Sequence, residues 1–472
     1  MARGWIGGLG ALADVARMRS DARMSDKTTG VLAGPTTELL QALIRNQCVN
    51  DGAPGSGGEV RNAELLQTYL DGTGAGIERF ESHPGRGSIV ARIEGSNPDA
   101  PTLCLMGHTD VVPVNPAGWS RDPFGGELVD GEVWGRGAID MLNITASMAV
   151  AFRDLARRGF RPKGTLIYFG VADEEAGGRW GAKWMCDHHW DAIASDYVLT
   201  EMGGWSNIGA DGVRRVVVNT GEKGAAWRRL RVRGTPAHGS MPFGADNALI
   251  KAAEIVRRLA AYRPQAQISE IWRAQVAAMR LPDDLKAGLL DPARIWSTIE
   301  TLPPALARTC HATTHTTFSP NVVHGGQKTN IIPDLVEIEV DIRTVPGTTA
   351  ADVNAHLCEA LGELADSVEV TPLATADATA SPRGNALWDA LSSAIQVAYP
   401  GAELIPGLIV GGTDARFFRQ KGVVAYGAGL FSREVTFEMF GTRFHGNDER
   451  IDVASLGLAA DFWMHIARTI CG

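Results

Sequence analysis

The chain has 472 residues, 44% of them hydrophobic, so it can bury a large core, and its length favours two domains over one small module. A formal net charge of -9 argues against a surface built to bind phosphates, so we expect a small-molecule partner and no nucleic acid. The six cysteines lie far apart without a CxxC pair, which argues against a thiolate zinc site or a disulfide scaffold and favours a reducing, cytoplasmic compartment.

No stretch approaches the roughly 20 continuous apolar residues of a membrane span, so no membrane partner is expected. Residues 1–20 weakly resemble a signal peptide, but they are rich in glycine and interrupted by Asp14. We expect residues 1–30 to be disordered or a non-native extension, with Met24 as an alternative start.

Helical spacing and apolar runs alternate through the first half of the chain. The pattern predicts helices over 35–48, 59–72 and 141–159, and strands over 88–95, 102–107, 165–172 and 197–200. This alternation is typical of an α/β fold with a mostly parallel central sheet. The segment after about residue 375 again resembles this pattern, so we expect one domain to comprise 1–221 and 376–472.

A second pattern begins near residue 222 and predicts a separate α+β domain over 222–375. Strands are expected over 226–234, 313–323, 334–344 and 367–373, and helices over 246–262 and 349–364. The order β-α-β-β-α-β indicates a ferredoxin-like sheet with one exposed face. A helical insertion is expected at about 263–311, where Trp272, Met279, Leu289, Leu290 and Trp296 fit either a plain core or the lining of an apolar acyl pocket.

Acidic and histidine residues follow three predicted strands of the first domain, and taken singly each fits a surface pair, a solvated turn or a loop cap. His108 and Asp110 follow one strand, Asp173, Glu174 and Glu175 follow the next, and Glu201 follows the third. The carboxyl ends of parallel strands are where α/β sheets bind ligands.

Asp140 just before a long helix adds a further carboxylate, and gathered carboxylates repel one another unless a divalent cation lies between them. The late His445 adds a second imidazole, which makes a site for two metals feasible.

Seven motifs in order together resemble the M20 metallopeptidase family. They are GHTDVVPV (107–114), WGRGAIDM (134–141), ADEEAGG (172–178), TPAHGSMPFGADNA (235–248), TNIIP (329–333), GGTDARFF (411–418) and FHGNDER (444–450). That family includes glutamate-releasing carboxypeptidases, aminoacylases and succinyl-diaminopimelate desuccinylases. The resemblance implies a zinc-peptidase-like catalytic domain and an inserted lid and dimerisation domain.

The resemblance also implies a role for each residue of the site. Each subunit would hold two zinc ions, one bound by His108 and Glu201 and the other by Glu175 and His445, with Asp140 bridging the pair. Such a site also accepts manganese or cobalt. Glu174 would be the general base that takes a proton from a metal-bound water. Asp110 would orient the imidazole of His108, which lies two residues before it.

Further residues are implied to contact the substrate. His238 would reach the active site of the partner subunit in a homodimer, and Asn330 would assist the same tetrahedral intermediate. Arg343 would bind a substrate carboxylate, with an ion pair to the acids of its own strand as the alternative, and Gly412 and Thr413 would contact the same carboxylate.

The sequence therefore predicts a dinuclear zinc hydrolase of the peptidase or amidohydrolase class (EC 3.4 or 3.5.1). Its substrate would be a small molecule with a free carboxylate beside the cleaved bond, either an N-acyl amino acid or a short peptide. Two alternatives stay open: hydrolysis of a different small substrate, such as deamination of an aromatic acid, and a non-catalytic, metal-stabilised dimer.

Overall fold

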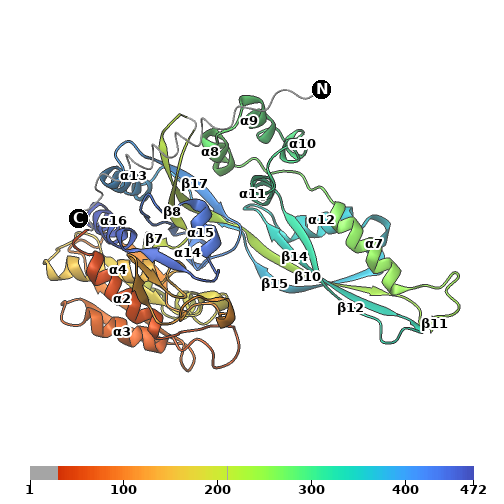
Figure 1. The fold of residues 1–472 in the computed structure, drawn as a ribbon, viewed down its shortest axis with the longest axis horizontal. Coiled ribbons are helices and arrows are strands. Elements are labelled where there is room, and N and C mark those ends of the chain that lie inside the picture. Colours follow the sequence, from red (N-terminus) through yellow and green to blue (C-terminus); the bar gives the residue numbers. More distant parts are fainter. Residues whose placement is uncertain (1–29, 210) are drawn as a thin grey trace.

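A computed structural model describes residues 30–209 and 211–472, which form two bodies joined by two adjacent crossings of the chain (Figure 1). Residues 1–29 lie outside the described part of the chain. The expectations of a signal-like start, of Met24 as an alternative start and of an N-terminal extension concern these residues. Among the residues that the structure describes, no helix has the length and apolar character needed to cross a membrane.

The first body is built on a ten-stranded sheet. Its order is β1 (Gly76–Glu81), β2 (Gly87–Ile93), β6 (Leu166–Val171), β3 (Leu103–His108), β7 (Tyr197–Thr200), β18 (Val424–Gly427), β9 (Arg214–Glu222) and β16 (Thr379–Ala380), with β8 (Gly203–Ile208) and β17 (Glu403–Ile409) also paired to β9. The four strands β6, β3, β7 and β18 run parallel, while β1, β2, β8 and β16 pair antiparallel at the margins.

Helices cover both faces of this sheet, which explains why its central strands are continuous apolar runs. Every residue of β3 and of β6 is buried, as is usual for parallel strands inside an α/β layer. The longer helices are α2 (Ala33–Arg45), α3 (Val60–Leu70), α4 (Leu142–Arg157), α13 (Ala386–Ala398) and α16 (Val453–Cys471), and the shorter ones are α5 (Ala182–His188), α6 (Trp190–Ile193), α14 (Ala415–Gln420) and α15 (Phe437–Arg443). A three-stranded sheet of β4 (Glu127–Val129), β5 (Glu132–Trp134) and β19 (Arg450–Asp452) completes the body.

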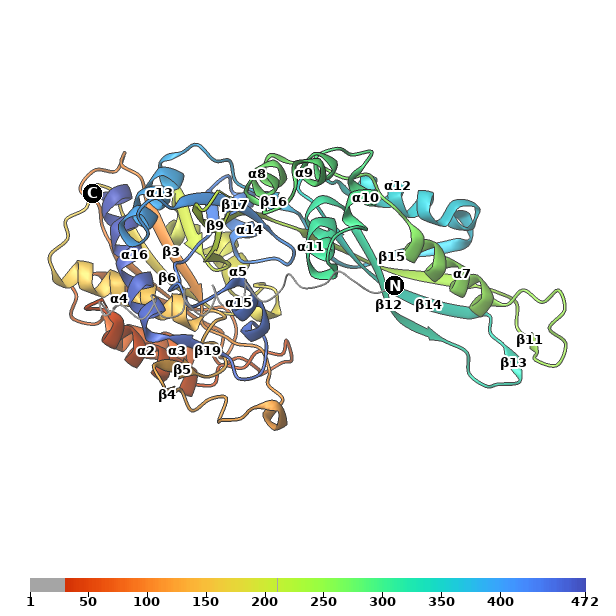
Figure 2. The ribbon, with the colours of Figure 1, turned by 45° about the horizontal axis from the view of Figure 1, so that its top comes forward.

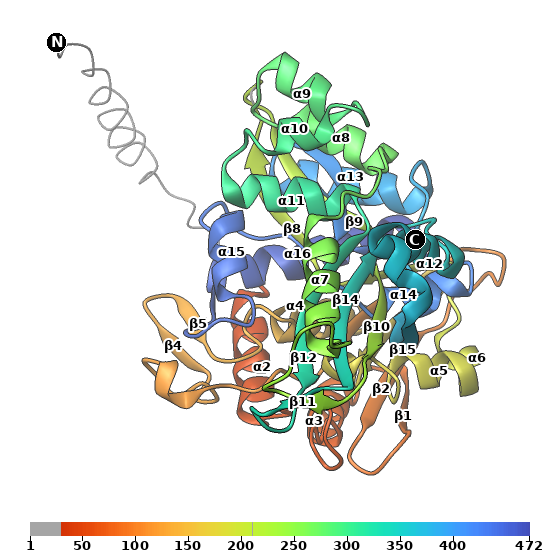
Figure 3. The ribbon, with the colours of Figure 1, turned by 90° about the vertical axis from the view of Figure 1, so that its right-hand side faces the viewer.

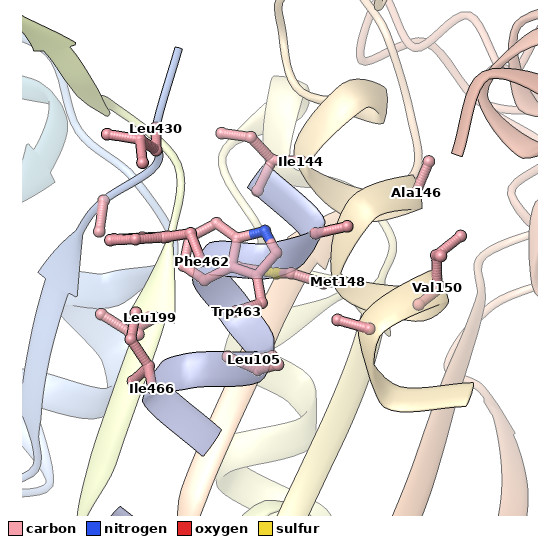
Figure 4. Close-up of a cluster of buried hydrophobic side chains, with 14 of the residues drawn as sticks. Leu105, Ile144, Ala146, Met148, Val150, Leu199, Leu430, Phe462, Trp463 and Ile466 are labelled. Carbon is pink, nitrogen blue, oxygen red and sulfur yellow. The ribbon is translucent and has the colours of Figure 1, made fainter. Parts of the chain in front are cut away.

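The C-terminal helix α16 closes the core of the first body. Trp463 is fully buried in the same core cluster as Met148 of α4 and Leu105 of β3 (Figure 4). Its indole N–H donates to Ser147 Oγ at 2.9 Å, so the polar atom of this large side chain is satisfied. The 19 residues of α16 are thus an integral part of the first body rather than an appended tail.

The second body contains a four-stranded antiparallel sheet in the order β12 (Thr317–Gly325), β14 (Leu335–Thr344), β10 (Gly224–Arg233) and β15 (Val368–Ala376). Helices α7 (Ala248–Ala261) and α12 (Ala350–Leu361) cover one face, where the alternate apolar residues of β10 and β14 are buried. The other face carries cross-strand ion pairs, such as Arg229 with Glu339 and Arg231 with Glu337, each at 2.7 Å. This alternation is the physical basis of the exposed face that the sequence predicts. A two-stranded ribbon, β11 (Ala237–His238) and β13 (Ile331–Ile332), lies at the far tip (Figure 2).

The insertion forms four short helices beside the junction of the two bodies (Figure 2), and they lie together at the top of the end-on view (Figure 3). They are α8 (Glu270–Ala278), α9 (Asp283–Leu289), α10 (Ile295–Ile299) and α11 (Pro304–Thr314). Trp272 and Leu289 are fully buried in a core that belongs to these helices, and the Trp272 indole N–H donates to the Leu289 carbonyl at 2.8 Å. These side chains are core residues rather than the lining of an acyl pocket. Helix α11 extends to Thr314, so the strand expected from 313 begins only at Thr317.

Candidate metal centre

The residues that end or closely follow three neighbouring parallel strands lie at one edge of the sheet. His108 is the last residue of β3 and is paired in register with Val171, the last residue of β6. Glu175 follows β6 by four residues, and Glu201 follows β7 directly. Because parallel strands end at the same edge, side chains distant in sequence converge there. Asp140, just before α4, and His445, just after α15, complete the group.

Asp140 lies between the two imidazoles. Its Oδ1 is 3.2 Å from His108 Nε2, and its Oδ2 is 2.8 Å from His445 Nε2. On one side Glu201 Oε2 is 3.8 Å from His108 Nε2, and on the other Glu175 Oε2 is 3.5 Å from His445 Nε2. The five residues therefore form two triads that share Asp140, with the potential ligand atoms of each triad within 4.8 Å of one another.

The charges of this cluster favour a bound cation. His108, Asp140 and Glu201 are buried, whereas His445 is exposed and gives access to the site. Burial, reinforced by the charge of Asp140, raises the pKa of Glu201 to about 8. Burial lowers the pKa of His445, but Asp140 and Glu175 outweigh it and raise that pKa to about 10. Each carboxylate thus gains by having positive charge beside it.

The donor set fits two divalent metal ions of the zinc type. It offers two imidazole nitrogens and three carboxylates, and one of the carboxylates is shared by the two triads. Within residues 30–209 and 211–472, the buried Glu175 Oε1 accepts no hydrogen bond, which leaves it acceptor capacity for a cation.

A buried network orients His108. Its Nδ1 is 3.0 Å from the backbone carbonyl of Asp110 and 3.5 Å from the Asp110 carboxylate, so the carbonyl is the nearer acceptor. Asp110 Oδ2 accepts from the side chain of Asn50 at 2.8 Å and from the backbone N–H of Glu175 at 3.1 Å. Asp110 therefore connects one candidate ligand to the turn that carries another, and Asn50 is a supporting residue that the sequence did not reveal.

Glu174 lies beside the candidate ligand Glu175 in the 3-10 turn Glu174–Ala176. Burial and the nearby charge of Glu201 raise its pKa well above the usual range of a glutamate. The preceding Asp173 fixes the turn, because its left-handed backbone (φ 73°) reverses the chain and its Oδ2 accepts from the Trp180 N–H at 2.7 Å.

Glu449 holds the loop that leads to Asp140. The Glu449 carboxylate is fully buried and accepts from Arg136 Nη1 at 2.6 Å and from the backbone N–H groups of Gly137, Ile139 and Asp140 at 3.2, 2.5 and 3.0 Å. The motif FHGNDER contains this residue, but its partners lie more than 300 positions earlier. Sequence reasoning therefore singled out His445 and missed Glu449.

Two of the implied substrate residues lie far from this cluster in the single chain. His238 and Asn330 are exposed at the ribbon of β11 and β13, at the tip of the second body (Figures 1 and 2). The backbone N–H of Gly239 donates to the Asn330 carbonyl at 2.8 Å, so the two residues stay close to each other.

The other implied substrate residues already have protein partners or lie in an open loop. Arg343 lies near the end of β14, with its Nε 2.8 Å from Asp341 Oδ1 and its guanidinium over the ring of Trp227 at 5.3 Å. Gly412 is exposed, while Thr413 is buried and donates both its N–H and its hydroxyl to Glu222 Oε2, at 2.9 and 2.8 Å.

An α/β sheet with two overlapping candidate metal triads at its strand ends, joined to a small antiparallel domain, is the arrangement of a class of metal-dependent hydrolases. The model of Peptidase family M20/M25/M40 matches residues 104–469, so the chain belongs to this family and is one of its metallopeptidase or amidohydrolase enzymes. The family resemblance and the fold class that the sequence predicts are both confirmed.

Relatives and solved structures agree with this assignment. The chain is 27% identical to the N-fatty-acyl-amino acid synthase/hydrolase PM20D1 of Xenopus tropicalis, over 80% of this chain and 74% of that protein. It is 26% identical to Aminoacylase-1 of Sus scrofa, over 92% of this chain and 94% of that protein. Its fold is similar to that of the M20 family metallo-carboxypeptidase Sso-CP2 from Sulfolobus solfataricus, with a TM-score of 0.68 at 18% identity, covering 92% and 98% of the two chains.

Proposed function

We propose that this protein is a dinuclear zinc hydrolase that releases amino acids from N-acyl amino acids. The observation that carries the proposal is the pair of triads that share Asp140, with Glu174 next to the candidate ligand Glu175. The named activities of the two relatives, an N-fatty-acyl-amino acid hydrolase and an aminoacylase, support an N-acyl amino acid as the substrate class.

Each candidate ligand has a part in this proposal. In it, His108 and Glu201 would hold one ion and Glu175 and His445 the other, with Asp140 shared between the two groups. Zinc, when bound, lowers the pKa of a coordinated water and polarises the amide carbonyl, and manganese or cobalt would serve the same purpose.

Glu174 moves the proton in the proposed reaction. Its carboxylate accepts a proton from the attacking water and passes it to the nitrogen of the leaving amine when the amide bond breaks. Its burial supports this role, because a carboxyl with a raised pKa is better matched to proton transfer near neutral pH. Asp110 keeps both His108 and the turn of Glu175 in place.

The second body supplies substrate contacts in a homodimer. Arg343 binds the substrate carboxylate, and His238 and Asn330 of each chain approach the metal centre of the other. The exposed apolar surface around the tip supports this arrangement: Met241, Phe243 and Ile250 are 70%, 103% and 67% exposed. Large apolar side chains exposed in one region of a surface are typical of protein interfaces.

A substrate screen tests the proposed activity. Purified protein is stripped of metal with a chelator, reloaded with zinc, and assayed with N-acyl amino acids and with dipeptides of matched C-terminal residue. We expect release of the amino acid from the N-acyl substrates. Cleavage of dipeptides alone would reject the N-acyl assignment and indicate a dipeptidase.

The variant Glu174→Gln separates catalysis from metal binding. It should keep two zinc ions per chain by elemental analysis and lose nearly all turnover, whereas Glu175→Gln should lose zinc as well. Substantial residual hydrolysis by Glu174→Gln would contradict its role as the base.

Mixing inactive variants tests the shared site. His238→Ala and Glu174→Gln are each expected to be inactive as purified dimers. If His238 acts in the partner subunit, mixed dimers contain one complete site, and activity should partly return after subunit exchange. Sedimentation at the assay concentration gives the oligomeric state. A fully active monomer would contradict the homodimer.

A further inference from the structure

The two bodies are joined at a narrow hinge. Strand β9 ends at Glu222 and β10 begins at Gly224, so Lys223 alone separates the two sheets on the outward crossing. The chain returns between Ala376 of β15 and Thr379 of β16, and Thr379 is paired in register with Glu222. Any movement of one body relative to the other must be accommodated at these adjacent crossings and where helix α8 of the insertion packs against β17.

Glu222 ties the hinge to the loop that precedes α14. Its side chain is fully buried, and its Oε2 accepts the N–H and the hydroxyl of Thr413. Arg419 Nη1 lies 3.4 Å from the same oxygen, and the Thr379 hydroxyl donates to Oε1 at 3.3 Å. Hydrogen bonds to a buried carboxylate are among the stronger ones in proteins, so this connection is stiff.

The same loop holds the turn that carries the proposed base. The N–H of Arg416 donates to the Thr413 carbonyl at 3.4 Å, and Arg416 Nη2 donates to the Gly177 carbonyl at 2.8 Å. The buried Asp414 lies against Gly178 so closely that a Cβ atom there would come within 2.2 Å of Asp414 Oδ1. Gly177 and Gly178 directly follow the 3-10 turn Glu174–Ala176.

Lys223 contacts the insertion of the second body. The Lys223 ammonium is buried and donates to the carbonyls of Ala312 and His315 at 2.8 and 2.7 Å, at the C-terminal end of α11. The carbonyls at the end of a helix attract a cation, while burial lowers the pKa of Lys223 to about 7. The consecutive residues Glu222 and Lys223 therefore bind the loop before α14 on one side and the insertion on the other.

We propose that Glu222 and Thr413 are positioning residues that act through Arg416 and Asp414 to place Glu174 and Glu175, and so connect the hinge to the base. The inference rests on the proposed function for the role of Glu174. It gives Thr413 a task different from the substrate contact expected from the sequence, since its hydroxyl is buried and donated to Glu222.

Hydrogen–deuterium exchange of the full-length, zinc-loaded protein tests the connection without any substrate. Thr413→Val removes the hydroxyl at nearly constant shape and should increase exchange in residues 173–178, whereas Thr413→Ser should restore the wild-type rate. Thr37→Val is the matched control, because the Thr37 hydroxyl is also buried but donates only to Ala33 of its own helix, at 2.8 Å. Arg416→Met interrupts the path at a half-buried position and should also increase exchange in residues 173–178.

Kinetics give the second readout. With a substrate that the wild type hydrolyses, Thr413→Val should lower kcat about tenfold or more with KM little changed, because a small misplacement of a catalytic group slows the chemical step. A higher KM with unchanged kcat would overturn the inference in favour of direct substrate contact.

Unchanged exchange in residues 173–178 in both Thr413→Val and Arg416→Met would also overturn it. If the wild type hydrolyses none of the substrates offered, the proposed function fails, while the exchange experiment still decides whether the connection exists.

Discussion

Replacing Glu449 by Gln tests how the loop before Asp140 is held. The Glu449 carboxylate accepts one side-chain and three backbone N–H groups, and both it and Arg136 are buried, with 0% and 3% of their surfaces exposed. Glutamine has almost the same shape, so no cavity is created. It offers one acceptor oxygen, however, and directs an NH2 group toward donors that need an acceptor.

The expected loss follows from the chemistry of that site. Breaking a buried ion pair leaves the other charge uncompensated and costs about 3–5 kcal/mol, so Glu449→Gln should lower the free energy of unfolding by about that amount. The backbone N–H of Asp140 loses its acceptor, and Asp140 belongs to both triads. Metal affinity should therefore fall by about 10–100-fold, as for other residues that orient metal ligands.

Urea unfolding of the metal-free protein measures the first quantity, and competition with a chromogenic chelator measures the second. Glu64→Gln is the control, since it makes the same chemical change in an exposed pair with Arg79 and should cost less than about 1 kcal/mol. A loss below about 1 kcal/mol for Glu449→Gln, with unchanged zinc affinity, would refute the argument that this carboxylate holds the loop.

Three further outcomes are expected. Chelation should lower the melting temperature, because the clustered carboxylates lose their counter-charge, and zinc at 100 times its Kd should restore about 2.7 kcal/mol per site in a titration followed by calorimetry. Burial, with smaller contributions from His311 and Lys223, lowers the pKa of His315 to about 4, below its ordinary 6.5. The neutral imidazole therefore stabilises the folded protein above pH 6.5, and this contribution is lost as the pH falls toward 4. From pH 7 to pH 5, the free energy of unfolding should fall by about 2 kcal/mol more in the wild type than in His315→Gln. Urea titrations at each pH measure both values. Trp272→Ala should destabilise the insertion by about 3–5 kcal/mol by the same method, and a smaller loss would mean that its core is loosely packed.

The metal centre could be predicted because its residues follow recognisable strands. Continuous apolar runs identify β3, β6 and β7, and parallel strands bring His108, Glu175 and Glu201 to one edge. That part of the candidate site is encoded locally, in the change from apolar residues to potential metal ligands at the end of each strand.

The supporting residues could not be predicted, because a single sequence does not show which distant groups meet. Asn50 contacts Asp110, which is 60 positions away, and Glu449 contacts Arg136, which is 313 positions away. Whether a hydroxyl faces substrate or protein is likewise decided by tertiary contacts, as Thr413 illustrates. The strands β4 and β5 are only three residues each, too short to give a periodic signal.

The position of β18 affects how the protein is made. This strand lies between β7 and β9, so the main sheet remains divided until residues 424–427 have been synthesised. At a translation rate of about 5–20 residues per second, roughly 10–45 seconds pass between the synthesis of β7 and that of β18, and one edge of β7 is unpaired during this time. An unpaired strand edge is a template for aggregation. The nascent chain should therefore depend on chaperones during this interval, and chains that stop before β18 should be cleared rather than accumulate.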